Sequence, residues 1–157
     1  MSKSSGTKGL LAAAAIGLFV AHSAIAQQTK RQGLPLGSTA EFVYFSTGSH
    51  ELTADERGHL RDVAEMMQKT PNLVATIVGK TDTVGSASFN ERLSKRRADA
   101  VFESLVYDEK VPANRLHVCW TGERLPFIAT ANQVAESDNR MVGIIVGDKT
   151  FRYLCGD

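Results

Sequence analysis

Hydrophobic and polar positions follow two different periods along the chain, which predicts strands separated by helices. Runs rich in β-branched and aromatic residues predict four strands, at 42–45, 73–78, 116–120 and 141–146. Apolar residues recur every three or four positions over 54–69 and from 88 to about 107, which predicts two amphipathic helices. A third, short helix is expected at about 130–136, inside a segment of mixed polarity.

Polar signatures support the starts of the two main helices. Thr53 with Glu56, and Ser88 with Glu91, both have the spacing of a capping box, in which a hydroxyl and a carboxylate bond to free N–H groups of the first turn. Pro71 is expected to end the first helix. The order strand, helix, strand, helix, strand, short helix, strand indicates an α+β fold, built as a two-layer sandwich of one sheet and its helices.

One charged residue interrupts the apolar stripe of the second helix. Leu93, Val101 and Leu105 share one helix face, and Arg97 occupies the position between the first two. Burying a charge is costly unless polar groups surround it. Arg97 is therefore expected to have polar partners inside the fold.

Three polar residues are the expected neighbours of Arg97. Asn90 and Ser94 form a polar track beside it, and Asp82 lies on the turn before the helix. An anion, a cation and uncharged donors would suit a zwitterionic ligand, and N–H groups at the helix start also favour an anion. The spacing equally allows an internal salt bridge between Asp82 and Arg97 that closes the turn.

The stretch from Thr81 to Leu105 reads T-D-x-x-G-x-x-x-x-N-x-x-L-S-x-x-R-A-x-x-V-x-x-x-L. This spacing resembles the signature of OmpA-like peptidoglycan-binding domains, and with its flanks the resemblance covers about 41–146. Such domains occur in some outer-membrane barrels, in the peptidoglycan-associated lipoprotein and in flagellar stator proteins. The resemblance implies a mixed four-stranded sheet packed against two main helices, with the last strand antiparallel and central.

The resemblance also implies a function, the non-covalent binding of cell-wall peptidoglycan through the diaminopimelate of its stem peptides. Asp82 and Arg97 would hold diaminopimelate, with Asn90 in support, and their replacement by alanine is expected to abolish wall binding without unfolding the chain. Thr83 could line the pocket or cap the turn. Arg140 belongs to an Asn-Arg pair that resembles the one before the family's last strand, and it could face the ligand or an acidic neighbour.

The chain departs from the family pattern at three positions near this site. Ser46 follows Phe45 where the family often has a carboxylate, Lys80 stands where a histidine is common, and Gly143 replaces a frequent glutamate. These departures leave the Asp82 and Arg97 positions intact. A contact to the ligand from position 46 is put in doubt.

The first 26 residues have the pattern of a signal peptide: a basic start, an apolar run from Gly9 to Val20, and Ala24-Ile25-Ala26. A linker is then expected over 27–40, the domain over 41–147 and a tail over 148–157. Cleavage would leave 18 − 2 = 16 basic against 17 acidic residues, a formal charge of −1 that offers nucleic acid no bulk attraction. The expected product is a stand-alone periplasmic protein associated with the outer membrane or wall; an uncleaved leader would make it an inner-membrane wall tether.

Cysteine and histidine positions give no sign of catalysis or of a metal site. Cys119 and Cys155 lack metal-ligand spacing; in an exported protein they could form a disulfide, or Cys119 could be buried alone with Cys155 loose in the tail. His50, His59 and His117 are scattered, so neither an enzyme nor a cofactor is expected. The alternative function is a protein-interaction module that binds an outer-membrane or other envelope protein.

Overall fold

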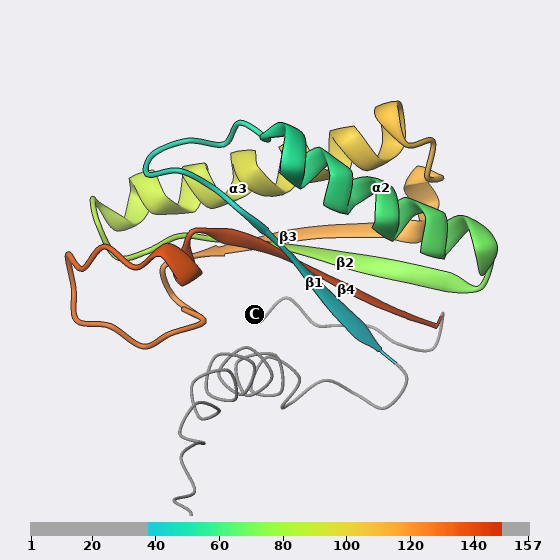
Figure 1. Cartoon of the computed structure of the whole chain (residues 1–157). Coiled ribbons are helices and arrows are strands. Elements are labelled where there is room, and N and C mark those ends of the chain that lie inside the picture. The colour runs from blue at the N-terminus through green and yellow to red at the C-terminus, as the bar shows by residue number, and fades with distance from the viewer. Residues whose placement is uncertain (1–37, 149–157) are drawn as a thin grey trace, which may run out of the picture. The chain divides into compact units, whose positions relative to one another are not determined.

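The computed structural model describes residues 38–148 (Figure 1). Its long elements are the strands β1 (Thr39–Tyr44), β2 (Leu73–Lys80), β3 (Leu116–Gly122) and β4 (Met141–Asp148), and the helices α2 (Ala54–Lys69) and α3 (Ala87–Glu103). A π-helical turn, Ser104–Asp108, prolongs α3, and short 3-10 turns occupy Ala113–Arg115 and Ser137–Asn139. The predicted signal peptide, most of the predicted linker and tail, and Cys155 lie outside the described residues.

The four strands form one mixed sheet in the order β1-β4-β2-β3. β4 runs antiparallel to both of its neighbours, whereas β2 and β3 are parallel. α2 and α3 both cover the same face of this sheet (Figure 1). The predicted α+β fold, with the last strand antiparallel and central, is confirmed.

The predicted bounds of α2 are also confirmed, because its start is set by a local hydrogen bond. Thr53 Oγ1 accepts from the backbone N–H of Glu56 at 3.2 Å, as the first half of the capping box requires. The side chains that α2 turns toward the sheet are fully buried; they are Leu60, Val63, Ala64 and Met67.

The predicted capping box at the start of α3 is wrong. The capping residue is Ser86, whose Oγ accepts from the N–H of Phe89 at 3.2 Å, and the helix begins at Ala87. Gly85 before it has a φ of +104°, a conformation that glycine adopts at little cost. The chain therefore turns into the helix two residues earlier than the Ser88 box would place its cap.

The predicted third helix is wrong as well. Residues 130–136 form turns and extended chain, and the nearest helical turn is Ser137–Asn139. At the sheet ends, two residues expected in the linker, Thr39 and Ala40, pair with β4. Asp148, expected in the tail, pairs with Leu73 of β2.

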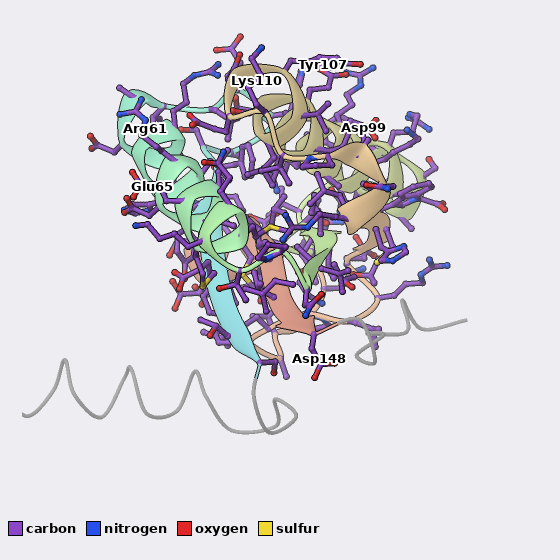
Figure 2. The ribbon with its side chains drawn as sticks, turned by 90° about the vertical axis from the view of Figure 1, so that its right-hand side faces the viewer. Arg61, Glu65, Asp99, Tyr107, Lys110 and Asp148 are labelled. Atoms are coloured by element: carbon purple, nitrogen blue, oxygen red, sulfur yellow. The ribbon has the colours of Figure 1, made fainter. Side chains whose placement is uncertain are left out.

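The core lies between the helices and the covered face of the sheet, where strand side chains alternate with those of the opposite face. Charged side chains such as Arg61, Glu65 and Asp99 extend outward from the helices (Figure 2). Within 38–148, neither α2 nor α3 is long and apolar enough to cross a membrane.

Gly79 of β2 allows α3 to lie directly on the sheet. A Cβ atom added there would meet the carbonyl oxygen of Ser94 at 2.0 Å, and backbone atoms cannot move aside cheaply. We expect Gly79→Ala to lower the free energy of unfolding by about 3 kcal/mol or more, measured by urea denaturation. Gly58→Ala is the matched control: nothing lies near that position in α2, so stability should rise by about 0.5–1 kcal/mol. Equal stability of Gly79→Ala and the parent chain would contradict the close approach.

Candidate ligand-binding site

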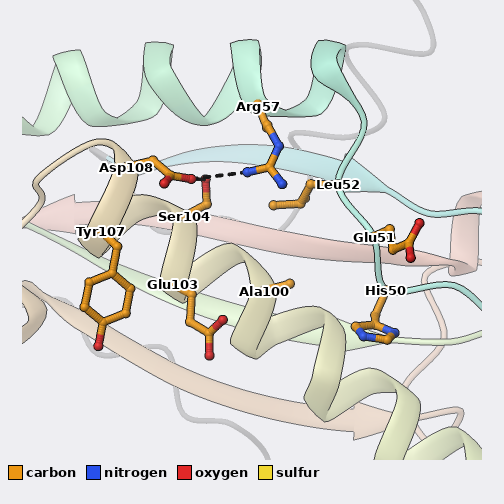
Figure 3. Close-up of a pocket in the computed structure, with 9 residues that line it drawn as sticks. All are labelled: His50, Glu51, Leu52, Arg57, Ala100, Glu103, Ser104, Tyr107 and Asp108. Atoms are coloured by element: carbon orange, nitrogen blue, oxygen red, sulfur yellow. Dashed lines mark hydrogen bonds and ion pairs between the residues drawn. The ribbon is translucent and has the colours of Figure 1, made fainter.

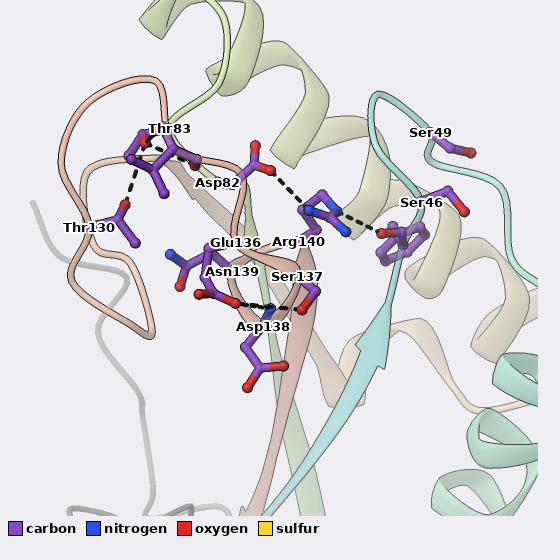
Figure 4. A network of polar contacts seen from close by, with 12 residues as sticks. Ser46, Ser49, Asp82, Thr83, Thr130, Glu136, Ser137, Asp138, Asn139 and Arg140 are labelled. Atoms are coloured by element: carbon purple, nitrogen blue, oxygen red, sulfur yellow. Dashed lines mark hydrogen bonds and ion pairs between the residues drawn. The ribbon is translucent and has the colours of Figure 1, made fainter.

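The predicted pocket lies at the edge of the sheet where β2 ends and β4 begins. Because β4 runs antiparallel to β2, with Gly79 opposite Val142, Asp82 after β2 and Arg140 before β4 are brought together. Arg140 Nη1 lies 3.2 Å from Asp82 Oδ2, and Arg140 Nε donates to the carbonyl oxygen of Phe45 at 3.3 Å. Figure 4 shows the two side chains turned toward each other. Both are largely buried, with 7% of the Asp82 and 18% of the Arg140 side chain exposed.

Arg97 lies completely buried beneath the loop that connects β1 and α2. Its Nε donates to the carbonyl of Ser49 at 2.8 Å, Nη1 to that of Lys80 at 3.0 Å, and Nη2 to that of Ser46 at 3.1 Å. The guanidinium also stands over the ring of Phe45, 5.2 Å from its centroid. The expected polar partners of Arg97 are thus mainly backbone carbonyls.

The site carries an excess of positive charge. Burial lowers the pKa of Arg97 to about 10; Asp82 opposes this shift and Arg140 adds to it. The pKa remains well above neutral, so Arg97 is charged at pH 7. Burial also lowers the pKa of Lys80, whose ammonium donates to the carbonyl of Leu125. Two guanidinium groups thus act on the single carboxylate of Asp82, which leaves the site able to accept a further anionic group.

The internal Asp82–Arg97 salt bridge, which the sequence left open, is not formed. Asp82 pairs with Arg140, and Arg97 is directed under the loop before α2, where three carbonyl oxygens converge on it. The two residues still interact through space, since the charge of Asp82 raises the pKa of Arg97.

Asn90 is buried near the start of α3 and is paired with a residue that the sequence did not single out. Its Nδ2 donates to the carboxylate of Glu123, which follows β3. Its Oδ1 has no hydrogen-bond partner among the described residues. Ser94 donates to the carbonyl of Glu91 at 2.8 Å and accepts from the N–H of Gly122, so it bonds to its own helix and to β3.

Thr83 fastens the long loop between β3 and β4 to the turn after β2. Its hydroxyl contacts the carbonyl of Ala131 at 2.8 Å and accepts from the N–H of Val134 at 3.0 Å. The side chain of Gln133 makes two further bonds to the backbone of Gly85. The two roles predicted for Thr83, lining the pocket and capping the turn, both concern this turn after β2. In the structure, the hydroxyl of Thr83 holds the loop between β3 and β4.

Residues 44–140 match the sequence model of the OmpA family. The chain belongs to the OmpA family. Its relatives include outer membrane porin F of Pseudomonas aeruginosa, 30% identical over 100 residues, and the peptidoglycan-associated lipoprotein of Rhizobium meliloti, 31% identical over 105 residues. The matched regions are 64% and 67% of this chain, and 29% and 59% of those relatives. The chain therefore spans less than a third of porin F, and these relatives are a porin and a lipoprotein of the cell envelope.

Solved structures show the same OmpA-like fold. The peptidoglycan-associated lipoprotein of Burkholderia pseudomallei superposes with a TM-score of 0.62 at 23% identity, covering 67% of this chain and 88% of that one. The periplasmic domain of Helicobacter pylori MotB superposes with a TM-score of 0.61 at 17% identity, covering 74% and 80%.

The OmpA-like site also depends on residues whose part the sequence did not predict. Asn139 is fully buried and bonds through both side-chain atoms to the backbone of Ile128, which fixes the long loop just before Arg140. The carbonyls of Ser46 and Ser49 carry no sequence signal, because any residue supplies one. Among residues 38–148, no three His, Cys, Asp or Glu side chains are grouped as metal ligands would be.

The predicted disulfide concerns Cys119, which lies buried in β3. Its predicted partner, Cys155, is outside the described residues. The pairing of these two cysteines stays a prediction.

Proposed function

We propose that this OmpA-like chain binds cell-wall peptidoglycan without a covalent bond, by recognising the diaminopimelate of its stem peptides. The observation that carries the proposal is the largely buried Asp82–Arg140 pair with the guanidinium of Arg97 beside it. Diaminopimelate offers a free carboxylate and a free ammonium group on one short side chain, so its receptor needs an anion and a cation at a fixed separation. The signature around Asp82 and Arg97, and a relative named for its association with peptidoglycan, support the same ligand.

In this proposal the ligand replaces the contact that Arg140 makes with Asp82. The ligand's ammonium donates to Asp82, and the more exposed Arg140 turns to the ligand's carboxylate. Arg97 supplies the second positive charge; three of its five N–H donors are used by carbonyls, which leaves one each on Nη1 and Nη2. Asn90 contributes its unpartnered Oδ1, and Thr83 holds the loop at the rim.

Burial makes this exchange selective. Breaking the Asp82–Arg140 contact costs free energy in a site that excludes most water, so a ligand must return two charge-assisted bonds for the one it displaces. A zwitterion can do this. A ligand with only the ammonium would leave Arg140 and Arg97 without an anion.

The proposal places the mature chain in the periplasm, exported by the predicted signal peptide and held at the wall or the outer membrane. A second candidate function is binding of an envelope protein. The observation that favours it is a set of exposed apolar side chains on the loop between β3 and β4: Leu125, Phe127, Ile128 and Val134.

Co-sedimentation with purified sacculi tests the proposal. We expect the chain to pellet with sacculi whose stem peptides carry diaminopimelate, and to stay in solution with sacculi that carry lysine at the same position. Lysine has the ammonium but lacks the second carboxylate, so it cannot satisfy both charges of the site. Free meso-diaminopimelate should compete. Equal sedimentation with both kinds of sacculi would show that the site does not read diaminopimelate.

A further inference from the structure

An open groove of about 470 Å³ lies between α2 and α3 (Figure 3). It is separate from the charged site, by which we mean Asp82, Arg97 and Arg140. Three segments form it: His50 to Leu52 of the loop before α2, Arg57 in the first turns of α2, and the end of α3 with its π-helical turn. The volume is within the range of ligand sites in proteins. Nothing in the proposed recognition of diaminopimelate uses these side chains.

The groove combines a flat aromatic surface with hydrogen-bonding groups. Tyr107 lies at one end, with 66% of the residue exposed, and Leu52 and Ala100 add apolar surface. Glu51 and Glu103 also line the groove, and neither takes part in an ion pair among the described residues. An apolar ring face beside free acceptors suits a ligand that has both a C–H face and hydroxyl groups.

The guanidinium donor of the groove, Arg57, contacts the π-helical turn in the absence of a ligand. Arg57 Nη1 lies 3.2 Å from Asp108 Oδ2, and Ser104 Oγ donates to the same oxygen at 3.0 Å. Figure 3 shows this chain of contacts crossing between the two helices. Because this contact restrains Arg57, half of whose side chain is exposed, ordering its guanidinium against a neutral oxygen of a ligand costs less conformational entropy.

The charge of the groove narrows the class of ligand. The lining holds three carboxylates, those of Glu51, Glu103 and Asp108, and one guanidinium, that of Arg57, so the balance of these four groups is net negative. This balance disfavours phosphates and other anions. A neutral, hydroxyl-rich molecule meets no such penalty, because its hydroxyls can donate to the carboxylates.

The groove and the charged site share two elements, the loop before α2 and helix α3. His50 follows Ser49, whose carbonyl accepts from Arg97. Ala100 and Ser104 lie three and seven positions after Arg97, so the groove follows α3 for roughly 10 Å from it. A polymer that has one group at Asp82 could thus place a neighbouring group in the groove.

We propose that the groove binds N-acetylated saccharide units, with one pyranose ring stacked on Tyr107 beside Glu103 and the hydroxyls of a neighbouring unit bonded to Arg57 and Glu51 (Figure 3). The proposal rests on the proposed function for the source of the saccharide, the glycan strand of peptidoglycan. Its chemistry rests on the groove alone. The groove would then add a glycan contact to the stem-peptide contact at Asp82.

The test uses a peptide-free probe, tetra-N-acetylchitotetraose, titrated into the isotope-labelled full chain and followed by NMR. We expect amide shifts at His50, Glu103 and Tyr107 that saturate at roughly millimolar concentration. Tyr107→Ala should weaken binding about fivefold or more, whereas Tyr107→Phe keeps the ring and should bind as the parent chain does. Phe89→Ala is the control, since Phe89 is an exposed aromatic of α3 outside the groove.

Two further arms separate this proposal from its alternatives. Asp82→Asn should leave the chitotetraose shifts unchanged. If the parent chain shows these shifts but fails to pellet with diaminopimelate-type sacculi, the result counts against the diaminopimelate proposal alone. Absence of groove shifts, or equal affinity of Tyr107→Ala and the parent chain, would overturn the saccharide proposal. Trilysine is the second probe: saturable groove shifts with trilysine and none with the saccharide would assign the groove to a basic peptide instead.

Discussion

We expect Asp82→Asn to release the chain from diaminopimelate-type sacculi, with a loss of affinity of about 30-fold or more. Asparagine keeps the shape of the side chain but cannot neutralise the ligand's ammonium. Loss of one partner of a buried, hydrogen-bonded charge pair typically costs about 2–5 kcal/mol of binding free energy, and 2 kcal/mol is already about 30-fold. The measurement is a co-sedimentation isotherm over a range of sacculus concentrations.

The fold should survive this change. Arg140 is partly exposed, so water can solvate it when its ion pair is lost, and the amide oxygen of the substituted side chain can still accept from it. The charges of Arg97 and Arg140, which act on each other, are then no longer balanced by the carboxylate, and we expect the free energy of unfolding to fall by about 1–2 kcal/mol. Urea denaturation followed by circular dichroism gives this value.

Asp99→Asn provides the matched control for net charge. Asp99 pairs with Lys95 at 2.7 Å on the exposed side of α3, and 40% of its side chain is accessible. This variant has the same formal charge as Asp82→Asn and should pellet with sacculi as the parent chain does. Undiminished binding by a folded Asp82→Asn variant would place the ligand elsewhere on the chain.

Elements whose ends depend on neighbouring residues were predictable from the sequence. The capping pair of Thr53 and Glu56 lies within one turn, and α2 begins and ends where the pattern indicated. Two overlapping serine signals precede α3, and the choice between Ser86 and Ser88 depends on the conformation of Gly85. The order of the strands came from the family resemblance, because hydrophobic periodicity does not specify which strands pair.

The loop between β3 and β4 could not be predicted, because its course is set by distant contacts. Thr83 and Gln133 meet across 50 positions of the chain, and Asn139 holds Ile128. Polar segments of this kind lack a period, so a short helix at 130–136 was the best local interpretation. The structure instead uses these side chains to dock the loop.

The candidate site was predictable in composition but not in pairing. A charge on an apolar helix face required buried polar partners, and Arg97 has them. That these partners are carbonyls of Lys80, Ser46 and Ser49 could not be inferred, since backbone groups leave no pattern. The Asp82–Arg140 contact joins residues 58 positions apart, and it depends on the position of β4 beside β2.

Arg97→Met is expected to destabilise the fold as well as abolish wall binding. Removing the guanidinium takes a donor from three part-buried carbonyl oxygens, at about 1–3 kcal/mol for each that has no other donor; the carbonyl of Ser46 still accepts from the N–H of Ser49 at 3.1 Å. Relief from burying a charge acts in the opposite direction, as the lowered pKa of Arg97 indicates. We expect the carbonyls to dominate, with a net loss of about 2–4 kcal/mol in the free energy of unfolding.

This dual role changes how an arginine variant is interpreted. An unfolded Arg97→Ala chain would not show that the site is merely structural, because Arg97 braces the loop before α2 whether or not a ligand binds. Arg97→Lys keeps the charge but loses the planar fork that reaches three separate carbonyls. It should recover part of the stability and little of the binding.

Arg115→Met is the control that separates the two roles. Arg115 also donates to three backbone carbonyls, those of Met67, Thr70 and Leu73, but at the opposite end of β2 from Asp82. Its loss should lower stability without affecting sedimentation with sacculi, provided that binding is measured at a temperature where each variant is folded. If Arg97→Met, once folded, binds sacculi as well as Arg115→Met does, then Arg97 serves the loop alone. In that case Asp82 and Arg140 would have to carry the recognition of both ligand charges.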